Sequence, residues 1–276
     1  MTHSVIVILF HNFMIFLATA SFFLIGLIIG SFLNVVILRG ERGEGLGGRS
    51  RCMACARTLG ILELIPLFSF LWQKGKCKGC KERFSIQYPL VELSTAAAFA
   101  AIAWYFLPSL YGENAATSAQ VLLYLAVVLL VACACIVVVT SDLRFQIIPD
   151  GAVVLLGLSG IVVSLNRGSL AWDSAAAVAC SLFFFLLWFV SGGRWMGFGD
   201  VKLTLATVLL VGFPAAIAAV LFAFWIGGIV GVILLAGGRK AWGSRIPFGP
   251  FILAGALAAW LWADLFFAFT GLHILL

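Results

Sequence analysis

The chain has 276 residues, of which 63% are hydrophobic and only 10% are charged. This composition lies far outside the usual balance of a soluble globular domain and excludes that class. The net charge of +6 needs no nucleic-acid partner to explain it, because basic residues beside apolar segments are attracted to anionic lipid head groups. We therefore predict a protein of the lipid bilayer with no nucleic-acid partner.

Apolar segments recur along the chain, and most are long enough to cross a bilayer as helices, which takes roughly 20 residues at about 1.5 Å each. Their approximate ranges are 13–38, 90–108, 119–141, 151–166, 171–190, 200–212, 214–236 and 249–271, the sixth being short. The first lacks the basic cluster and cleavage site of a secretory signal, so we expect a retained helix. The sequence predicts an all-α polytopic membrane protein with about eight transmembrane helices.

Basic residues are concentrated between the first two apolar segments. The stretch from Arg39 to Tyr88 holds ten lysines and arginines, whereas the loops on the opposite side hold Arg167 alone. Because lysine and arginine are retained on the cytoplasmic side, we expect this stretch in the cytoplasm and both termini outside. The predicted organisation is a first transmembrane helix (1–38), a cytoplasmic insert (39–89) and a seven-helix membrane domain (90–276).

Four cysteines in the insert form two C-x2-C hooks. Cys52 and Cys55 form the first, and Cys77 and Cys80 form the second, 21 residues further on. Two such hooks can close tetrahedrally on one zinc ion, because the two-residue gap turns both thiolates inward. Disulfides are disfavoured on the reducing side of a membrane. We predict a structural, zinc-ribbon-like site, with two redox dithiols or inert thiols as alternatives.

The segment RGERGEGLGGRS (39–50) precedes the first hook and is rich in glycine. We interpret it as a flexible linker, with a nucleotide-binding loop as the alternative.

Some polar side chains lie in or beside the apolar segments. Ser31 and Asn34 could line a site or bond to another helix, and we favour the second reading. Glu92 follows a Tyr-Pro pair, where a first-turn carboxylate would be stabilised by the helix dipole, and a functional role is the alternative. Asp173 is expected in a solvated outer loop.

Three aspartates gather at the expected cytoplasmic ends of helices. Asp142 is the last polar residue of an otherwise apolar segment, and Asp200 follows Gly197 and Gly199 at the start of another. Asp150 follows a proline and precedes a new apolar run, so we expect it to cap a helix. Asp142 and Asp200 sit at the same depth, and their side chains can converge if their helices pack together.

A pair of convergent carboxylates suits acid–base chemistry. Two carboxylates that share a site do not easily both ionise, so one holds a proton while the other stays charged. The ionised one can take a proton from water that attacks a peptide carbonyl, and the protonated one can donate to the carbonyl oxygen. The glycines would let a peptide approach Asp200 closely. The alternative is an ion- or proton-coupled transporter that uses paired aspartates.

Five stretches, in order, resemble the type IV prepilin peptidases, bacterial leader peptidases that are often also N-methyltransferases. They are GSFLNVVILR (30–39), CMAC…GKCKGCKERFSIQYPLVE (52–92), DLRFQIIPD (142–150), GFGDVKL (197–203) and IPFGPFILAG (246–255). Family members often have a proline inside the first cysteine hook, which CMAC lacks.

The resemblance implies a role for particular residues. The catalytic pair carries over to Asp142 and Asp200, and Asp150 is left as a capping or supporting carboxylate. It further implies cleavage of the basic leader of prepilins and pseudopilins, at the cytoplasmic face of a bacterial inner membrane, in type IV pilus assembly or protein secretion. Methylation of the new N-terminal residue with S-adenosylmethionine is implied as well, although the sequence identifies no residues that hold this cofactor.

Overall fold

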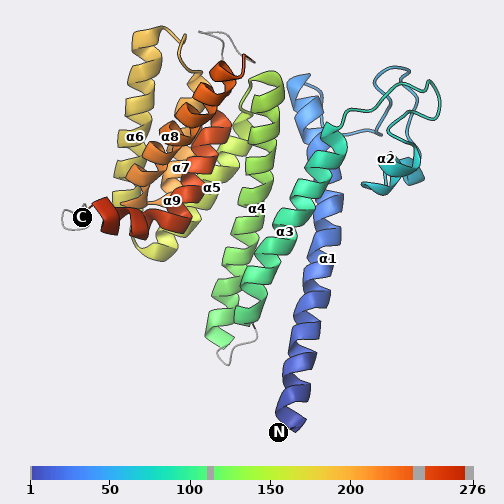
Figure 1. Cartoon of the computed structure of the whole chain (residues 1–276), viewed down its shortest axis with the longest axis horizontal. Helices are drawn as coiled ribbons and strands as arrows, with labels where there is room; N and C mark the ends of the chain where they lie inside the picture. The colour runs from blue at the N-terminus through green and yellow to red at the C-terminus, as the bar shows by residue number, and fades with distance from the viewer. Residues whose placement is uncertain (1, 111–114, 239–245, 271–276) are drawn as a thin grey trace. The chain divides into compact units, whose positions relative to one another are not determined.

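The computed structural model describes residues 2–110, 115–238 and 246–270, and no strand forms within these ranges. The helices, shown in Figure 1, are α1 (Thr2–Glu41), the 3-10 turn η1 (Ile61–Glu63), α2 (Phe68–Trp72), α3 (Gln87–Leu110), α4 (Ala115–Phe145), α5 (Asp150–Arg167), α6 (Leu170–Ser191), α7 (Phe198–Val211), α8 (Ala215–Ala236) and α9 (Gly249–Thr270). The predicted all-α class is confirmed.

Seven helices of the described ranges are long and apolar enough to cross a membrane, namely α1, α3, α4, α5, α6, α8 and α9. The remaining segment predicted to span, 200–212, is α7, which has only 14 residues. At about 1.5 Å per residue a helix of this length is shorter than the hydrocarbon layer. The polytopic prediction is confirmed, with seven helices of spanning length and one short helix.

The chain divides into two compact units, Met1–Val137 and Val138–Leu276, with the boundary inside α4. In the first unit α1 and α3 run side by side (Figure 1). Their contact is close because Gly26 and Gly30 lie one helical turn apart on α1. A Cβ at Gly26 would lie 2.6 Å from Ala96 Cα, and one at Gly30 would lie 2.7 Å from Glu92 Cα. This is the small-residue packing by which membrane helices bring their backbones together.

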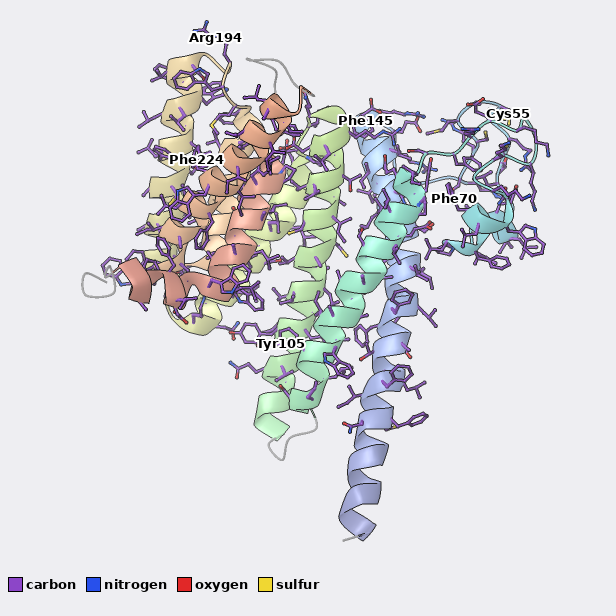
Figure 2. All side chains as sticks on the ribbon, in the orientation of Figure 1. Cys55, Phe70, Tyr105, Phe145, Arg194 and Phe224 are labelled. Atoms are coloured by element: carbon purple, nitrogen blue, oxygen red, sulfur yellow. The ribbon has the colours of Figure 1, made fainter. Side chains whose placement is uncertain are left out.

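In the second unit α7 contacts α5, α6, α8 and α9. Small residues again permit close approach: a Cβ at Gly160 of α5 would lie 2.9 Å from Leu210 N, and one at Gly255 of α9 would collide with Ala219 O. Beside these contacts Phe184, Phe224 and Phe248 form a cluster of rings with centroids 5.2 to 6.1 Å apart; Phe224 is labelled in Figure 2. The short helix α7 is therefore stabilised by packing against its neighbouring helices.

Asp173 corrects one expectation from the sequence. It is fully buried in α6 rather than solvated in a loop. Its carboxylate accepts hydrogen bonds from Ser164 Oγ (2.6 Å), Ser169 Oγ (2.7 Å) and Phe213 N (2.9 Å), and Arg167 lies 3.5 Å away. Ser164, Arg167 and Ser169 precede Asp173 closely in the sequence, whereas Phe213 is 40 residues away, so the local pattern could not reveal the whole network.

Candidate active site and metal centre

Asp142 and Asp200 both lie in the second unit and both are buried, with 5% and 6% of their surfaces exposed. Asp142 is in the last turn of α4, and Asp200 is in the first turn of α7. Each accepts one backbone hydrogen bond from a glycine: Gly249 N donates to Asp142 Oδ2 (2.9 Å), and Gly197 N donates to Asp200 Oδ2 (3.0 Å). No basic side chain of the described ranges forms an ion pair with either carboxylate.

The two carboxyl groups are close enough to interact electrostatically. The side chain of Ile148 lies beside two glycines of the site: a Cβ at Gly199 would lie 3.1 Å from Ile148 Cβ, and one at Gly249 would lie 3.4 Å from Ile148 Cδ1. A Cβ at Gly249 would also come within 2.7 Å of Asp142 Oδ2. Glycine at 249 therefore lets the backbone N–H reach the Asp142 carboxylate.

Gly249 is a site residue that the pattern of carboxylates in the sequence does not indicate. It lies in the motif IPFGPFILAG, which carries part of the family resemblance, and it precedes a proline at the start of α9. Its donor is a backbone N–H, and the residue type does not reveal where a backbone N–H donates. The contact with Asp142 could be predicted only from how the two helices pack.

Asp150 does not cap α5 as expected. The N-cap residue is Pro149, and no side-chain cap hydrogen bond is made there. Asp150 is the first residue of the helix, and its exposed carboxylate instead pairs with Lys202 Nζ, two residues beyond Asp200. The contact ties the start of α5 to the first turns of α7.

The four cysteines of the insert converge, with all their sulfur atoms within 4.8 Å of one another. The two hooks have the same turn. Cys52 N bonds to Arg57 O and Ala56 N to Cys52 O, while Cys77 N bonds to Glu82 O and Lys81 N to Cys77 O. Four sulfurs at this separation fit one tetrahedral ion, so the cluster could hold a metal.

The environment of Cys77 favours its deprotonated, thiolate form. Backbone hydrogen bonds from Cys80 and Gly79 lower the pKa of the Cys77 thiol to about 6. The thiolate, rather than the thiol, is the metal ligand. Cys77 and Cys52 are also buried, whereas Cys55 and Cys80 are exposed, so the cluster has one closed side and one open side.

The polar residues of the first unit bond between helices. Asn34 Nδ2 donates to Tyr88 O (3.1 Å), and Gln87 Nε2 donates to Asn34 Oδ1 (3.3 Å), which confirms the helix-bonding interpretation of Asn34. Glu92 lies in the second turn of α3, so the proposed first-turn dipole contact is wrong. Its carboxylate accepts a hydrogen bond from Leu67 N (2.8 Å), and the side chain of Ser31 is a close polar neighbour.

The glycine-rich segment wraps around Arg39. The guanidinium donates to a series of carbonyls, those of Gly45, Leu46, Gly47, Gly48 and Arg49. The carbonyls therefore face a cation, whereas a phosphate-binding loop presents its N–H groups to the ligand. This arrangement does not support the nucleotide-loop alternative, and the flexible-linker interpretation stays a prediction.

The fold and site define a class: a multi-pass helical membrane protein with a buried aspartate pair and a separate four-cysteine cluster. Residues 24–106 match the family described as "Bacterial Peptidase A24 N-terminal domain", and residues 129–232 match the "Type IV leader peptidase family". Relatives include proteins named prepilin leader peptidase/N-methyltransferase from Bacillus subtilis (34% identity; 90% of this chain and 95% of the relative), Pseudomonas aeruginosa (31%; 87% and 89%) and Aeromonas salmonicida (30%; 88% and 90%). No solved structure matches the chain.

The chain belongs to the type IV leader peptidase family. This confirms the resemblance recognised from the five motifs. The transporter alternative finds no support in these comparisons.

Proposed function

We propose that the protein is an aspartic endopeptidase that removes the leader peptide of type IV prepilins and pseudopilins, with Asp142 and Asp200 as its catalytic pair. The observation that carries the proposal is the burial of two carboxylates that interact with each other and have no cationic partner among the described residues. Membership of the family and the names of the relatives support the substrate class.

The proposed chemistry uses one proton shared by the pair. In a site shielded from water, two neighbouring carboxylates hold one proton between them, because ionising both is costly. The ionised member takes a proton from a water molecule as that water attacks the scissile carbonyl carbon, and the protonated member donates to the carbonyl oxygen. The N–H groups of Gly249 and Gly197 hold one oxygen of each carboxylate, which fixes the orientation of both groups.

We further propose that the protein methylates the new N-terminal residue with S-adenosylmethionine, as the name N-methyltransferase of its relatives suggests. This cofactor supplies the methyl group when bound. The same enzyme would then act twice on one polypeptide, first on the peptide bond and then on the amine that cleavage exposes.

The metal that we propose for the four-cysteine cluster is structural zinc, held by Cys52, Cys55, Cys77 and Cys80. Four thiolates complete a tetrahedral shell and leave no open position for a substrate, as is typical of structural sites. The matching turns of the two hooks support this role.

We propose that this multi-pass membrane protein lies in the bacterial inner membrane, with the short helix α7 counted as an eighth crossing and both termini therefore outside. The excess of lysine and arginine between residues 39 and 88 supports a cytoplasmic insert. Asp142 and Asp200 would then face the cytoplasm, where a membrane-inserted precursor presents its basic leader.

The test is cleavage of a purified prepilin in detergent by wild type, Asp142→Asn, Asp200→Asn and Asp150→Asn, followed by mass spectrometry. Asparagine is nearly isosteric but cannot cycle a proton, so we expect the first two variants to lose at least about a hundredfold in rate. Asp150→Asn should retain much of the activity. If a correctly folded Asp142→Asn or Asp200→Asn cleaves like wild type, the proposed mechanism is wrong.

A further inference from the structure

The segment between the two cysteine hooks exposes large apolar side chains. The turn η1 and the helix α2 bury none of their residues, and the exposed fraction is 82% for Ile61, 73% for Leu71 and 72% for Trp72. Leu62 and Phe68 are exposed as well, and the rings of Phe68 and Trp72 stack with their centroids 5.6 Å apart. We call these five residues the apolar face of the insert. Apolar side chains gathered on a surface in this way mark a place that a membrane or another molecule covers.

Helix α2 turns one side toward the protein and the other side away from it. Phe68, Leu71 and Trp72 are spaced i, i+3 and i+4, which places them on one side of a helix. The opposite side, labelled at Phe70 in Figure 2, lines a pocket of about 130 Å³ between α1, the insert and the start of α3, with Ser69, Phe70 and Gln73. The one polar residue of α2 is thus on the protein side, and the outward side is wholly apolar. This is the reverse of a helix that faces water.

The level of α2 along the transmembrane helices indicates what covers its outward side. Leu67 N, just before α2, donates to Glu92 Oε2 (2.8 Å), and a Cβ at Gly30 of α1 would lie 2.7 Å from Glu92 Cα. About 13 Å of helix separates Gly30 from Arg39, the next charged residue of α1, at about 1.5 Å per residue. The helix α3 offers only 23 residues for its crossing, so its second turn, which contains Glu92, already lies near the hydrocarbon boundary. The start of α2 therefore lies at the level of the membrane interface.

The cysteine cluster lies at the other edge of the insert. In Figures 1 and 2 Cys55 lies toward the C-terminal end of α1, whereas α2 lies further along α1 toward its N-terminus. Cys52 Sγ and Cys80 Sγ, one from each hook, are 3.8 Å apart. The segment between the hooks is therefore a loop whose two ends meet at the cluster. The cluster holds these ends, and the middle of the loop, residues 61–72, reaches toward the bilayer.

The charges beside the apolar face favour lipid as its partner. Four exposed lysines follow Trp72, and none forms an ion pair within the described ranges, namely Lys74, Lys76, Lys78 and Lys81. A tryptophan followed by lysines is typical of a membrane interface, where the ring lies at the level of the head groups and the ammonium groups attract anionic lipids. A second copy of the chain would instead bring the same positive charges to the contact, and these would repel.

We propose that the apolar face of the insert is embedded in the bilayer leaflet on the side of the insert, and that the lysines after α2 contact its anionic head groups. The four-cysteine insert is then anchored to the membrane through the middle of its loop, and the pocket beside α2 is held at the membrane surface. The inference goes beyond the proposed peptidase activity and does not depend on the roles of Asp142 and Asp200.

The test is photo-crosslinking of the full-length protein in vesicles of phosphatidylcholine and phosphatidylglycerol in equal amounts. The amino acid p-benzoylphenylalanine, which reacts with nearby C–H bonds on illumination, replaces Leu71 in one sample. In the matched control it replaces Ala54, an exposed residue of the first cysteine hook. Mass spectrometry should find about tenfold more lipid adduct at position 71 than at position 54, because an interfacial helix buries its apolar side about 5–10 Å into the acyl boundary. Phosphatidylglycerol should be in excess among the adducts.

Other products would overturn the proposal. Equal lipid adduct at positions 71 and 54 would show that the apolar face is not embedded, and a covalent dimer as the main product at position 71 would assign the face to a second copy. With prepilin added to the vesicles, a prepilin adduct that replaces the lipid adduct would assign the face to the apolar stem of the precursor. Adducts without an excess of phosphatidylglycerol would remove the contact assigned to the lysines. Should the sample replaced at Leu71 fail to fold, as its melting curve would reveal, replacement of the exposed Leu62 decides by the same criteria.

Discussion

The two units bury carboxylates in different surroundings. In the second unit Asp142 and Asp200 interact with each other, and each accepts one glycine N–H. In the first unit Glu92 is buried singly and borders a pocket. Asp173, also in the second unit, is surrounded by three hydrogen-bond donors and an arginine. The number and kind of partners therefore distinguish a pair of interacting carboxylates, a single buried carboxylate with uncharged neighbours, and a structural carboxylate with several donors.

The largest expected effect concerns the metal and should be confined to the first unit. Cys77→Ser removes a buried ligand, so we expect the metal content to fall from about one ion per chain to nearly none, since a structural zinc site contributes about 10–16 kcal/mol of apparent binding free energy. Elemental analysis measures the content, and hydrogen exchange should show lost protection in residues 50–83 but not in α5 to α9. Cys180→Ser, in α6, is the matched control that should keep the metal. A wild-type protein without metal and with a protected insert would contradict the zinc assignment.

Asparagine substitutions should distinguish the structural carboxylate from the proposed catalytic one. Asp173→Asn weakens a satisfied network and should lower the free energy of unfolding by about 1–3 kcal/mol. Asp200→Asn removes a buried carboxylate without a cation, so we expect no loss of stability or a slight gain. Chemical denaturation in detergent measures both, with the exposed Asp264→Asn as reference. Equal destabilisation by Asp173→Asn and Asp200→Asn would remove the distinction between these sites.

Helix pairing in the first unit depends on a glycine contact. Gly30→Leu places a side chain against Glu92 and Val91, so we expect overpacking to cost about 1–3 kcal/mol. Gly228→Leu on α8 is the control, because no atom lies within 4 Å of its Cβ position. Melting curves of both variants are the measurement. The packing argument fails if Gly30→Leu melts at the temperature of the control.

The smallest expected effect is at the ion pair between Asp150 and Lys202. The Asp150 side chain is 76% exposed, and exposed ion pairs contribute about 0–1 kcal/mol. Lys202→Met should therefore change the free energy of unfolding by no more than about 1 kcal/mol. A larger loss, measured by the same denaturation, would mean that the pair holds α5 against α7 more firmly than its exposure suggests.

Much of this architecture follows from local sequence patterns, and the rest depends on contacts between distant segments. Long apolar runs and the C-x2-C spacing are local, so the helices and the convergence of Cys52, Cys55, Cys77 and Cys80 were predictable. Three hydrogen bonds join residues that are 25 to 107 positions apart in the sequence. They run from Phe213 N to Asp173, from Gly249 N to Asp142 and from Leu67 N to Glu92. The sequence neighbours of Asp150 predict a helix cap. In the structure its carboxylate instead pairs with Lys202 on another helix.

The most direct test of the central claim, that Asp142 and Asp200 perform the cleavage, is the mass of pilin substrates after incubation with Asp200→Asn and S-adenosylmethionine. Intact prepilin and a pilin already lacking its leader are treated in parallel with the same enzyme sample. We predict that the prepilin keeps its leader while the leaderless pilin gains a methyl group, which shows that the variant is folded. Removal of the leader at the wild-type rate would contradict the assignment of the catalytic pair.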